Sequence, residues 1–415
     1  MNEINIKNNP IAAMQIPEFR GLLAGRFCFV LGLRMMGTLV GWWIYELTNA
    51  PFAIGLIGLA EVIPALSLAL YAGHVIDISE KKSLLLKGVF AFFLCSVILL
   101  FLSTSYLKIH VSKAIVIGGI YTIVFFTGII RSFAGPVFNA IVGQMIPKET
   151  LQNAITWNQG TWLTASVCGH ALAGFCIAYI NNSGTLIVVT FLMAFAFLLL
   201  TSIKRKPAAV TSGDKKTWES VKEGLRFVFR TKELLGSLFL DLFAVLFGGA
   251  VAMVPVYAKD ILNVGPIGFG WLNGAADIGS ILIVIILAVF PLRKKQGRTL
   301  LFAVAGFGIC IITFGISQLF WLSFTALLFS GVLDGISMVV RGTIVQLKTP
   351  NEMRGRVMSV NSMFINSSNE LGQFESGLAA KMFGVVPSVV FGGAMTLLVV
   401  VITWVKAPTL KKMEY

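Results

Sequence analysis

Residues 71–86 read YAGHVIDISEKKSLLL and place an aspartate, a glutamate and two lysines in a short turn between two long apolar runs. Charge is scarce elsewhere, because 13% of the 415 residues are charged and 56% are hydrophobic, whereas a soluble globular chain carries about 25% charged residues. A water-soluble fold of this length cannot bury so much apolar side chain. Repeated apolar stretches of about 20 residues have the length that crosses a bilayer as a helix. The sequence therefore predicts a multi-span membrane protein.

Helices are expected throughout, because backbone polar groups in lipid must pair within their own segment. A β-barrel would instead show alternating segments of about ten residues. Hydropathy and turn signals such as TNAP, NNSG and NVGP predict an all-α membrane protein with twelve transmembrane helices. The predicted spans are 21–47, 54–76, 83–104, 114–146, 155–180, 183–203, 234–258, 268–290, 299–319, 320–347, 355–382 and 385–406.

The start of the chain, MNEINIKNNPIAAMQIPEFR, is polar, and the first apolar run contains Arg26 and Arg34. Both features favour a retained first span over a signal peptide. The five cysteines lie inside apolar runs, with no CxxC motif and no cluster with the three histidines. Neither a disulfide nor a metal site is predicted, and no cofactor is expected.

The distribution of lysine and arginine sets the expected orientation. If both termini are cytoplasmic, most of the 33 basic residues fall in inner segments, and the outer loops hold Lys108, Lys113, Lys259 and Lys381. This bias predicts a multi-pass protein of the plasma membrane, the inner membrane of a bacterium. The net charge of +14 belongs to loops that face anionic lipid, so nucleic acid is not expected as a partner. The expected partner of these loops is the lipid bilayer, and the chain is expected to be a monomer.

An internal repeat organises the chain. IPKETLQNAITWNQ after span 4 and TPNEMRGRVMSVNS after span 10 share a proline, a glutamate two residues later and an asparagine eleven residues after the proline. The same offset of 203 residues matches Gly169 to Gly372, and an offset of 215 matches Gly55 to Gly270. Two six-span halves are predicted, at 1–203 and 234–415.

The segment 204–233 between the halves is predicted to be a cytoplasmic linker. It begins with the polar KRKPAAVTSGDKK and continues with TWESVKEGLRFVFRTKE, in which Trp218, Val221, Leu225 and Val228 share one helical face. Such a helix is expected to lie on the inner membrane surface. A solvated linker helix is the alternative.

Parallel six-span halves joined by a basic linker resemble the major facilitator superfamily. Gly73, Asp77, Lys81 and Lys82 resemble that superfamily's loop between spans 2 and 3, although Ile78 stands where the family usually has arginine. RGRVMSV at 354–360 and YELT at 45–48 resemble the branch that contains the enterobactin exporter and macrolide efflux proteins, which are drug:proton antiporters.

The resemblance implies that this loop latches the two halves at the cytoplasmic side. A carboxylate near a helix N-terminus is favoured by about 0.3–1 kcal/mol, and span 11 begins close to Gly355, so Asp77 is expected to hold that helix end. Lys81 and Lys82 would then remain for phosphates and acidic partners. The alternative is that these lysines and Lys87 only anchor the cytoplasmic side. The expected gate comprises Gly73, Asp77, Lys81, Lys82, Arg354 and Arg356.

Ionisable residues inside spans each cost about 2.5–3.5 kcal/mol or more at mid-bilayer and usually pair or function. The expected substrate and proton pathway comprises Arg34, Glu61, Arg131, Asp241, Asp334 and Glu370. In the superfamily, spans 1, 4, 7 and 10 line the central cavity, and these spans hold Arg34, Arg131, Asp241 and Asp334.

Arg131 and Asp334 are 203 residues apart and so occupy matching places in the two halves. They either form a structural pair or alternate between partner, proton and substrate. Arg341 lies two helical turns after Asp334, about 10 Å along the helix. At that separation it is expected to be a cytoplasmic-side anchor that does not pair with Asp334.

Spans 5 and 11 carry matched polar faces. Gln159, Trp162, Ser166 and His170 follow at helical spacing, and their counterparts at the 203-residue offset are Ser362, Ile365, Asn369 and Gln373. Such faces either contact a ligand or bond neighbouring helices. The possible cavity lining is Gln159, Trp162, His170, Asn369 and Gln373.

Three functional hypotheses follow. The first, which rests on the resemblance, is secondary active and proton-coupled export of an amphipathic small molecule, such as a siderophore or a drug, by alternating access. The second is import of a nutrient by the same architecture. The third is a membrane receptor or embedded enzyme, against which stands the lack of HExxH, GxSxG and P-loop patterns. Without a nucleotide-binding motif, energy is expected from an ion gradient or from the solute's own gradient.

Overall fold

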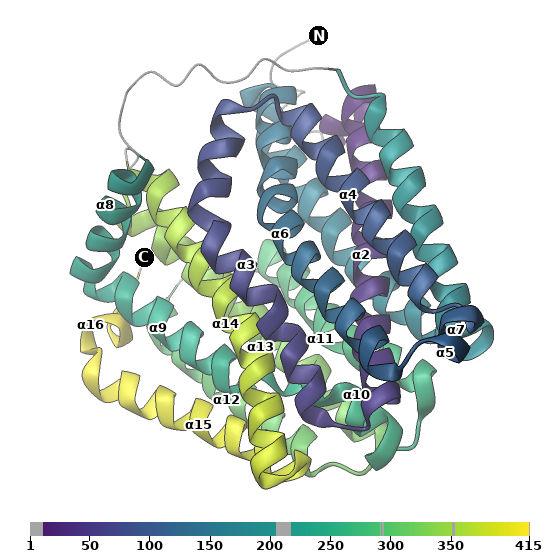
Figure 1. Ribbon diagram of the computed structural model, residues 1–415. Helices are drawn as coiled ribbons and strands as arrows, with labels where there is room; N and C mark the ends of the chain where they lie inside the picture. The colour runs from purple at the N-terminus through teal and green to yellow at the C-terminus, as the bar shows by residue number, and fades with distance from the viewer. Residues whose placement is uncertain (1–10, 205–216, 291, 293, 351–352, 415) are drawn as a thin grey trace. The chain divides into compact units, whose positions relative to one another are not determined.

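The computed structural model describes residues 11–204, 217–290, 292, 294–350 and 353–414, and this part of the chain is helical without a β-strand (Figure 1). The first half contains η1 (Ala13–Gln15), α2 (Pro17–Thr48), α3 (Pro51–Ile78), α4 (Lys81–Leu102), α5 (Ser105–His110), α6 (Lys113–Met145), η2 (Lys148–Thr150) and α7 (Leu151–Thr201). The second half contains α8 (Thr217–Arg230), α9 (Lys232–Phe247), η3 (Gly249–Met253), α10 (Val254–Val256), η4 (Tyr257–Ile261), α11 (Gly265–Val289), α12 (Gln296–Ile316), α13 (Phe320–Lys348), α14 (Arg354–Phe383), α15 (Val385–Lys406) and α16 (Pro408–Lys411).

The predicted all-α membrane fold is confirmed. Ten helical segments of the described chain are long and apolar enough to cross a membrane. One of them, α7, has 51 residues and changes direction at Asn181, where φ is 60°, so it supplies two spans. The more polar α14, with 30 residues, is the remaining span. The described helices therefore provide the twelve spans.

The bounds of the helices repeat at the two offsets found in the sequence. α2 begins at Pro17 and α9 at Lys232, which are 215 residues apart. α7 begins at Leu151 and α14 at Arg354, which are 203 residues apart. These two pairs of helix starts therefore match the offsets of the sequence repeat.

The chain forms two compact units. Unit 1 comprises Met1–Val40 and Ser67–Gly213, and unit 2 comprises Gly41–Leu66 and Asp214–Tyr415. In unit 1, α4 packs against α6 and α7, whereas in unit 2 α12 packs against α13 and α15, and α14 packs against α9. The units differ from the predicted halves at 41–66, which contains the end of α2 and the first part of α3.

Glycines explain why the first part of α3 belongs to unit 2. A Cβ atom on Gly58 would lie 2.4 Å from the carbonyl oxygen of Glu370, and one on Gly55 would lie 2.9 Å from the Cα atom of Gly377. The backbones of α3 and α14 therefore approach each other directly, as small residues allow between membrane helices.

A second pair of glycines serves the same purpose in both units. A Cβ atom on Gly169 of α7 would lie 2.7 Å from the Cβ atom of Arg34 on α2. One on Gly372 of α14 would lie 2.8 Å from the carbonyl oxygen of Val245 on α9. These glycines are the pair matched by the sequence repeat, and they bring α7 close to α2 and α14 close to α9.

The predicted amphipathic helix forms as α8. Val228 is buried, and Leu225 packs against the same core cluster, which includes Leu234 and Leu410. α8 contacts α9 and α14, so these two side chains pack on protein instead of lipid. Trp218 and Val221 lie outside the described side chains.

Candidate functional site

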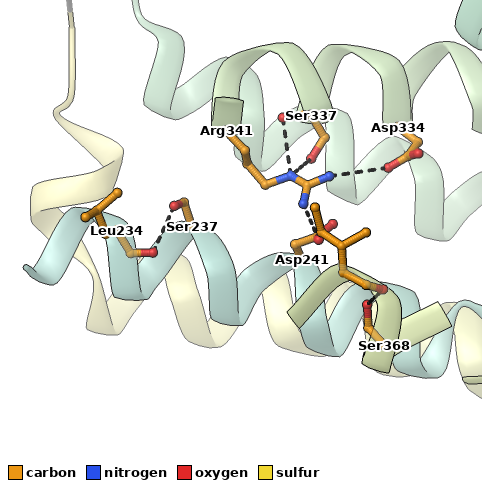
Figure 2. Close-up of polar contacts among 8 residues, drawn as sticks. Leu234, Ser237, Asp241, Asp334, Ser337, Arg341 and Ser368 are labelled. Atoms are coloured by element: carbon orange, nitrogen blue, oxygen red, sulfur yellow. Dashed lines mark hydrogen bonds and ion pairs between the residues drawn. The ribbon is translucent and has the colours of Figure 1, made fainter. Parts of the chain in front are cut away.

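The centre of unit 2 contains a buried arginine between two carboxylates. Arg341 on α13 is 6% exposed, and its Nη1 atom forms an ion pair with Oδ2 of Asp241 on α9 (Figure 2). Its Nη2 atom lies 3.8 Å from Oδ1 of Asp334, two helical turns earlier on the same face of α13. Its Nε atom donates to Oγ of Ser337 at 3.1 Å and to the carbonyl oxygen of Ser337 at 3.3 Å. Each of the three nitrogen atoms of the guanidinium thus has a polar or charged neighbour.

The two carboxylates of this cluster differ in exposure. The side chain of Asp241 is 6% exposed and that of Asp334 is 46% exposed. One cation faces two anions, so one carboxylate can take a proton without stranding the arginine. The carboxylate of Asp334 is the more exposed of the two.

The expectation that Arg341 cannot pair with Asp334 is wrong. Helical side chains lean toward the N-terminus of their helix, and Asp334 lies on that side of Arg341. The long side chain of Arg341 therefore reaches back over the two turns that separate it from Asp334 along the helix axis. The serine at the intermediate position, Ser337, was the available sequence signal, because it lies on the same face and offers an acceptor.

In unit 1 the structure brings together three residues of the predicted site. The guanidinium carbon of Arg34 lies 5.0 Å from the ring centroid of Trp162, a cation–π contact between α2 and α7. Oγ1 of Thr38, one turn after Arg34, lies 2.6 Å from Nδ1 of His170. Gly169 permits both contacts, because it has no side chain to separate the two helices. Gln159 is exposed on the same helix.

A second polar cluster of unit 1 was not predicted from the sequence. Arg26 on α2 is 6% exposed, and its Nη1 atom donates to Oδ1 of Asn158 on α7 at 2.5 Å and to Oδ1 of Asn139 on α6 at 3.2 Å. Nδ2 of Asn158 donates to Oδ1 of Asn139 at 3.1 Å. The ring centroid of Phe138 lies 5.3 Å from the guanidinium carbon. These residues form what we call the Arg26 cluster.

The repeat contained a signal for this cluster. Arg26 and Asp241 are 215 residues apart, and each lies nine residues after the start of its helix. Asn158 is the asparagine shared by the two matched segments. The local sequence around Arg26 does not indicate these partners, which lie on two other helices.

The other predicted pathway residues are dispersed over both units. In unit 2, Glu370 is buried, and its Oε2 atom accepts a hydrogen bond from Nε2 of Gln373 at 3.4 Å. Glu61 is half-buried, and Asn369 is exposed. Arg131 is exposed on α6 of unit 1. Because Arg131 and Asp334 belong to different units, their pairing stays a prediction.

The predicted gate residues occupy several environments. Lys81 is buried, and its Nζ atom donates to the carbonyl oxygens of Ile76 and, at 3.2 Å, of Ser79. Lys81 therefore caps the end of α3. The sequence had predicted instead that Lys81 remains available to phosphates and acidic partners. Nζ of Lys82 donates to the carbonyl oxygen of Thr201 at 2.7 Å. The side chains of Asp77 and Arg354, and the surroundings of Gly73, lie outside the described residues.

Arg356 has a different partner from the one expected for a gate. Its Nη1 atom forms an ion pair with Oε2 of Glu223 on α8. A Cβ atom on Gly224 would lie 3.0 Å from the carbonyl oxygen of Arg356. The ion pair and the close backbone contact hold α8 against the start of α14.

A further polar contact in unit 2 joins the end of α2 to η4. The hydroxyl of Tyr45 donates to Oδ2 of Asp260, and Nζ of Lys259 donates to Oδ1 of Asn49 at 2.8 Å. Nζ of Lys259 also lies 5.2 Å from the ring centroid of Tyr45. The YELT segment that carried the resemblance therefore contributes its tyrosine to a structural contact.

Comparisons with known proteins agree with this architecture. The profile of the transmembrane secretion effector family matches residues 8–415. The uncharacterized MFS-type transporter YfmI of Bacillus subtilis (strain 168) is 21% identical over 352 residues, which cover 81% of this chain and 83% of YfmI. The enterobactin exporter EntS of Shigella flexneri is 24% identical over 349 residues, which cover 82% of this chain and 80% of EntS.

Solved structures share the fold at lower identity. A mutant of the nucleoside transporter NupG superimposes with a TM-score of 0.75 at 12% identity, covering 94% of this chain and 99% of that chain. The D-xylose-proton symporter superimposes with a TM-score of 0.71 at 15% identity, covering 96% of this chain and 98% of that chain. The chain therefore belongs to the transmembrane secretion effector family of the major facilitator superfamily, and it is a membrane transporter, not an enzyme.

Proposed function

We propose that this transporter exports an amphipathic small organic molecule from the cytoplasm in exchange for protons, by alternating access of its two halves. The family match over residues 8–415 and the likeness to the exporter EntS favour export. The observation that carries proton coupling is the cluster of Asp241, Arg341 and Asp334. We expect it in a bacterial inner membrane with both termini cytoplasmic, because its basic residues gather in the corresponding loops.

Asp334 is the proposed proton carrier. Its carboxylate is the exposed member of the cluster, so a proton can reach it from water. When it is protonated, Arg341 keeps Asp241 as its counter-ion, and the cluster is neutral. When the proton leaves, the cluster carries one net negative charge, which favours a different arrangement of charged partners. A buried charge cluster that changes its net charge in this way can couple a proton to a conformational change.

The site of unit 1 supports an amphipathic substrate. Arg34 over the ring of Trp162 offers a cation beside an aromatic surface. His170 and Thr38 add a polar pair one to two turns along the same helix faces. Apolar walls with a few placed polar groups are typical of small-molecule sites.

Import of a nutrient is the second candidate. The D-xylose-proton symporter has the same fold, but at 15% identity the likeness carries no information on direction. The sidedness of transport separates the two candidates.

Everted membrane vesicles test the proposal. With a pH gradient that is acid inside, vesicles that contain the transporter should accumulate candidate siderophores or drugs, and an uncoupler should abolish accumulation. Vesicles from cells that express Asp334→Asn are the control without proton coupling. This variant removes the proposed carrier and leaves the Arg341–Asp241 pair. Accumulation that is equal in wild type and variant contradicts proton coupling through Asp334. Uptake only into right-side-out vesicles favours import.

The proposed topology has its own test. In a chain freed of its five cysteines, Tyr179→Cys and Asn263→Cys should react with an impermeant maleimide added to intact cells. Lys204→Cys should react only after the membrane is opened. The reverse pattern of labelling contradicts cytoplasmic termini.

A further inference from the structure

We propose that the Arg26 cluster of unit 1 binds a carboxylate or a similar organic anion carried by the transported molecule. Arg26, Asn139 and Asn158 are the residues of this site. The inference rests on the proposed function, because it assigns the chemical class of the exported solute.

The cluster holds a buried cation without a counter-ion. Within the described residues, Arg26 bonds only the amide oxygens of Asn139 and Asn158 and lies against the ring of Phe138. Its Nε atom is buried and has no hydrogen-bond partner there. A guanidinium withdrawn from water is costly unless it is paired and fully hydrogen-bonded. The site is therefore incomplete by one negative charge and at least one acceptor.

The matched site of unit 2 shows what is missing. The residue that corresponds to Arg26 at the 215-residue offset is Asp241, and the arginine of that cluster, Arg341, is balanced by Asp241 and Asp334. Its Nε atom donates to Ser337. The unit 2 cluster lies on α9 and α13, whereas in unit 1 α2, α6 and α7 contribute an arginine and two asparagines. A carboxylate supplied from outside the protein would give Arg26 what Arg341 receives from its own unit.

The chemistry of the three side chains suits a carboxylate. A guanidinium presents parallel donors that match the two oxygens of a carboxylate, and Nε is one of those donors. The amide groups of Asn139 and Asn158 add donors when their oxygens are released from Nη1. Asn139 is exposed at the edge of the cluster, so its side chain is the one that an entering anion displaces.

The position of the cluster suits loading from the cytoplasm. Arg26 lies nine residues after the start of α2, Asn139 six residues before the end of α6 and Asn158 seven residues after the start of α7. At 1.5 Å per residue, the three residues lie about 9–14 Å along their helices from these ends. The three ends lie on the same side of unit 1. The basic segments that follow and precede these ends favour the cytoplasmic side. An anion attracted to those segments would meet the Arg26 cluster on entry.

The test uses the full chain, purified in detergent at fixed ionic strength and at pH 7.5, with benzoate and benzamide as probes. The two probes have nearly the same shape and differ in charge. Benzoate should raise the unfolding temperature of the wild type in a saturable way, and benzamide should not. Equal effects of the two probes on the wild type would overturn the proposal.

Three variants locate the effect. Arg26→Gln should weaken benzoate binding at least tenfold. Asn139→Asp should do the same, because it places a carboxylate beside Arg26, and it should unfold at or above the temperature of the wild type without ligand. Arg20→Gln is the matched control, because Arg20 is exposed on the same helix, and it should bind benzoate as the wild type does. If Arg26→Gln does not fold, Asn139→Asp decides.

Benzoate binding that survives in Asn139→Asp, or that is lost equally in Arg20→Gln, would overturn the proposal. The binding assay needs no proton gradient, so it separates the two proposals. Intact benzoate binding by a protein that does not export would count against the proposed function alone. Proton-driven export by a protein that shows no preference for benzoate over benzamide would count against the anion site alone.

Discussion

Each unit buries an arginine at the meeting of its helices, but the two arginines have different partners. Arg341 in unit 2 lies between the carboxylates of Asp241 and Asp334. Arg26 in unit 1 has the amides of Asn139 and Asn158. The repeat therefore preserves the helices and the place of a polar cluster, while the sign of its net charge differs. An anionic cluster suits proton exchange, and a cationic cluster suits an anionic solute.

The largest expected difference between the units concerns removal of the two arginines. Arg341→Gln leaves two carboxylates without their cation, and removal of one partner from a buried pair typically costs about 3–5 kcal/mol. Arg26→Gln leaves no carboxylate behind, so its loss of stability should be much smaller. Unfolding in detergent, followed by tryptophan fluorescence against denaturant, measures both free energies. The double variant Arg341→Gln with Asp241→Asn is the control and should recover part of the loss. Equal losses for Arg26→Gln and Arg341→Gln would show that the two clusters do not differ in charge compensation.

The next difference lies between the two carboxylates of unit 2. Asp334→Asn should fold, because Arg341 keeps Asp241, and it should lose proton-driven export by more than tenfold. Asp241→Asn should lower stability by about 3–5 kcal/mol, because it removes the buried partner of Arg341. Everted vesicles with an imposed pH gradient measure export, and thermal unfolding of the purified protein measures stability. A folded Asp334→Asn variant with undiminished proton-driven export would remove Asp334 as the carrier.

The sequence predicts the helices better than it predicts the contacts between their side chains. Span 385–406 coincides with α15, because hydropathy and loop signals act locally and the bilayer imposes the length. Arg34 and Trp162 were both expected near the cavity, but the polar face of span 5 could have contacted a ligand or another helix, and the structure shows Trp162 against Arg34 beside Gly169. Such contacts can be predicted where one helix face is polar and a glycine shows where its neighbour lies.

Contacts that depend on side-chain reach were not predicted. The axial spacing of Asp334 and Arg341 does not include the length and direction of the arginine side chain. The partners of Arg26 lie 113 and 132 residues away on α6 and α7. Nothing in the local pattern connects those helices. The asparagine shared by the repeat marked one partner, and only the packing of three helices identifies the cluster.

A smaller effect tests whether the two units pack alike. Gly169→Ala and Gly372→Ala each place a methyl group 2.7–2.8 Å from an atom of the first helix of their unit, and overpacking of this kind costs about 1–3 kcal/mol. The two losses should agree within the error of an unfolding experiment. Gly135→Ala is the matched control, because nothing lies within 4 Å of its added methyl group, and it should be neutral or slightly stabilising. A loss confined to one of the two matched variants would contradict equivalent packing.

The smallest expected effect concerns the serine beside Arg341, which has no counterpart at Arg26. Ser337→Ala removes the hydroxyl that accepts from Nε at 3.1 Å, but the carbonyl oxygen of the same residue remains an acceptor at 3.3 Å. The loss of stability should therefore be about 0.5–1 kcal/mol, at the low end for a hydrogen bond. Proton-driven export should change by less than twofold, because both carboxylates stay in place. Denaturant unfolding and vesicle transport measure the two effects. Thr122→Ala, at an exposed position of α6, is the control for loss of a hydroxyl in a span. If Ser337→Ala were as destabilising as Arg341→Gln, the serine and not the carboxylates would hold the arginine. The difference between the two units would then lie in that hydroxyl, and charge compensation would no longer explain it.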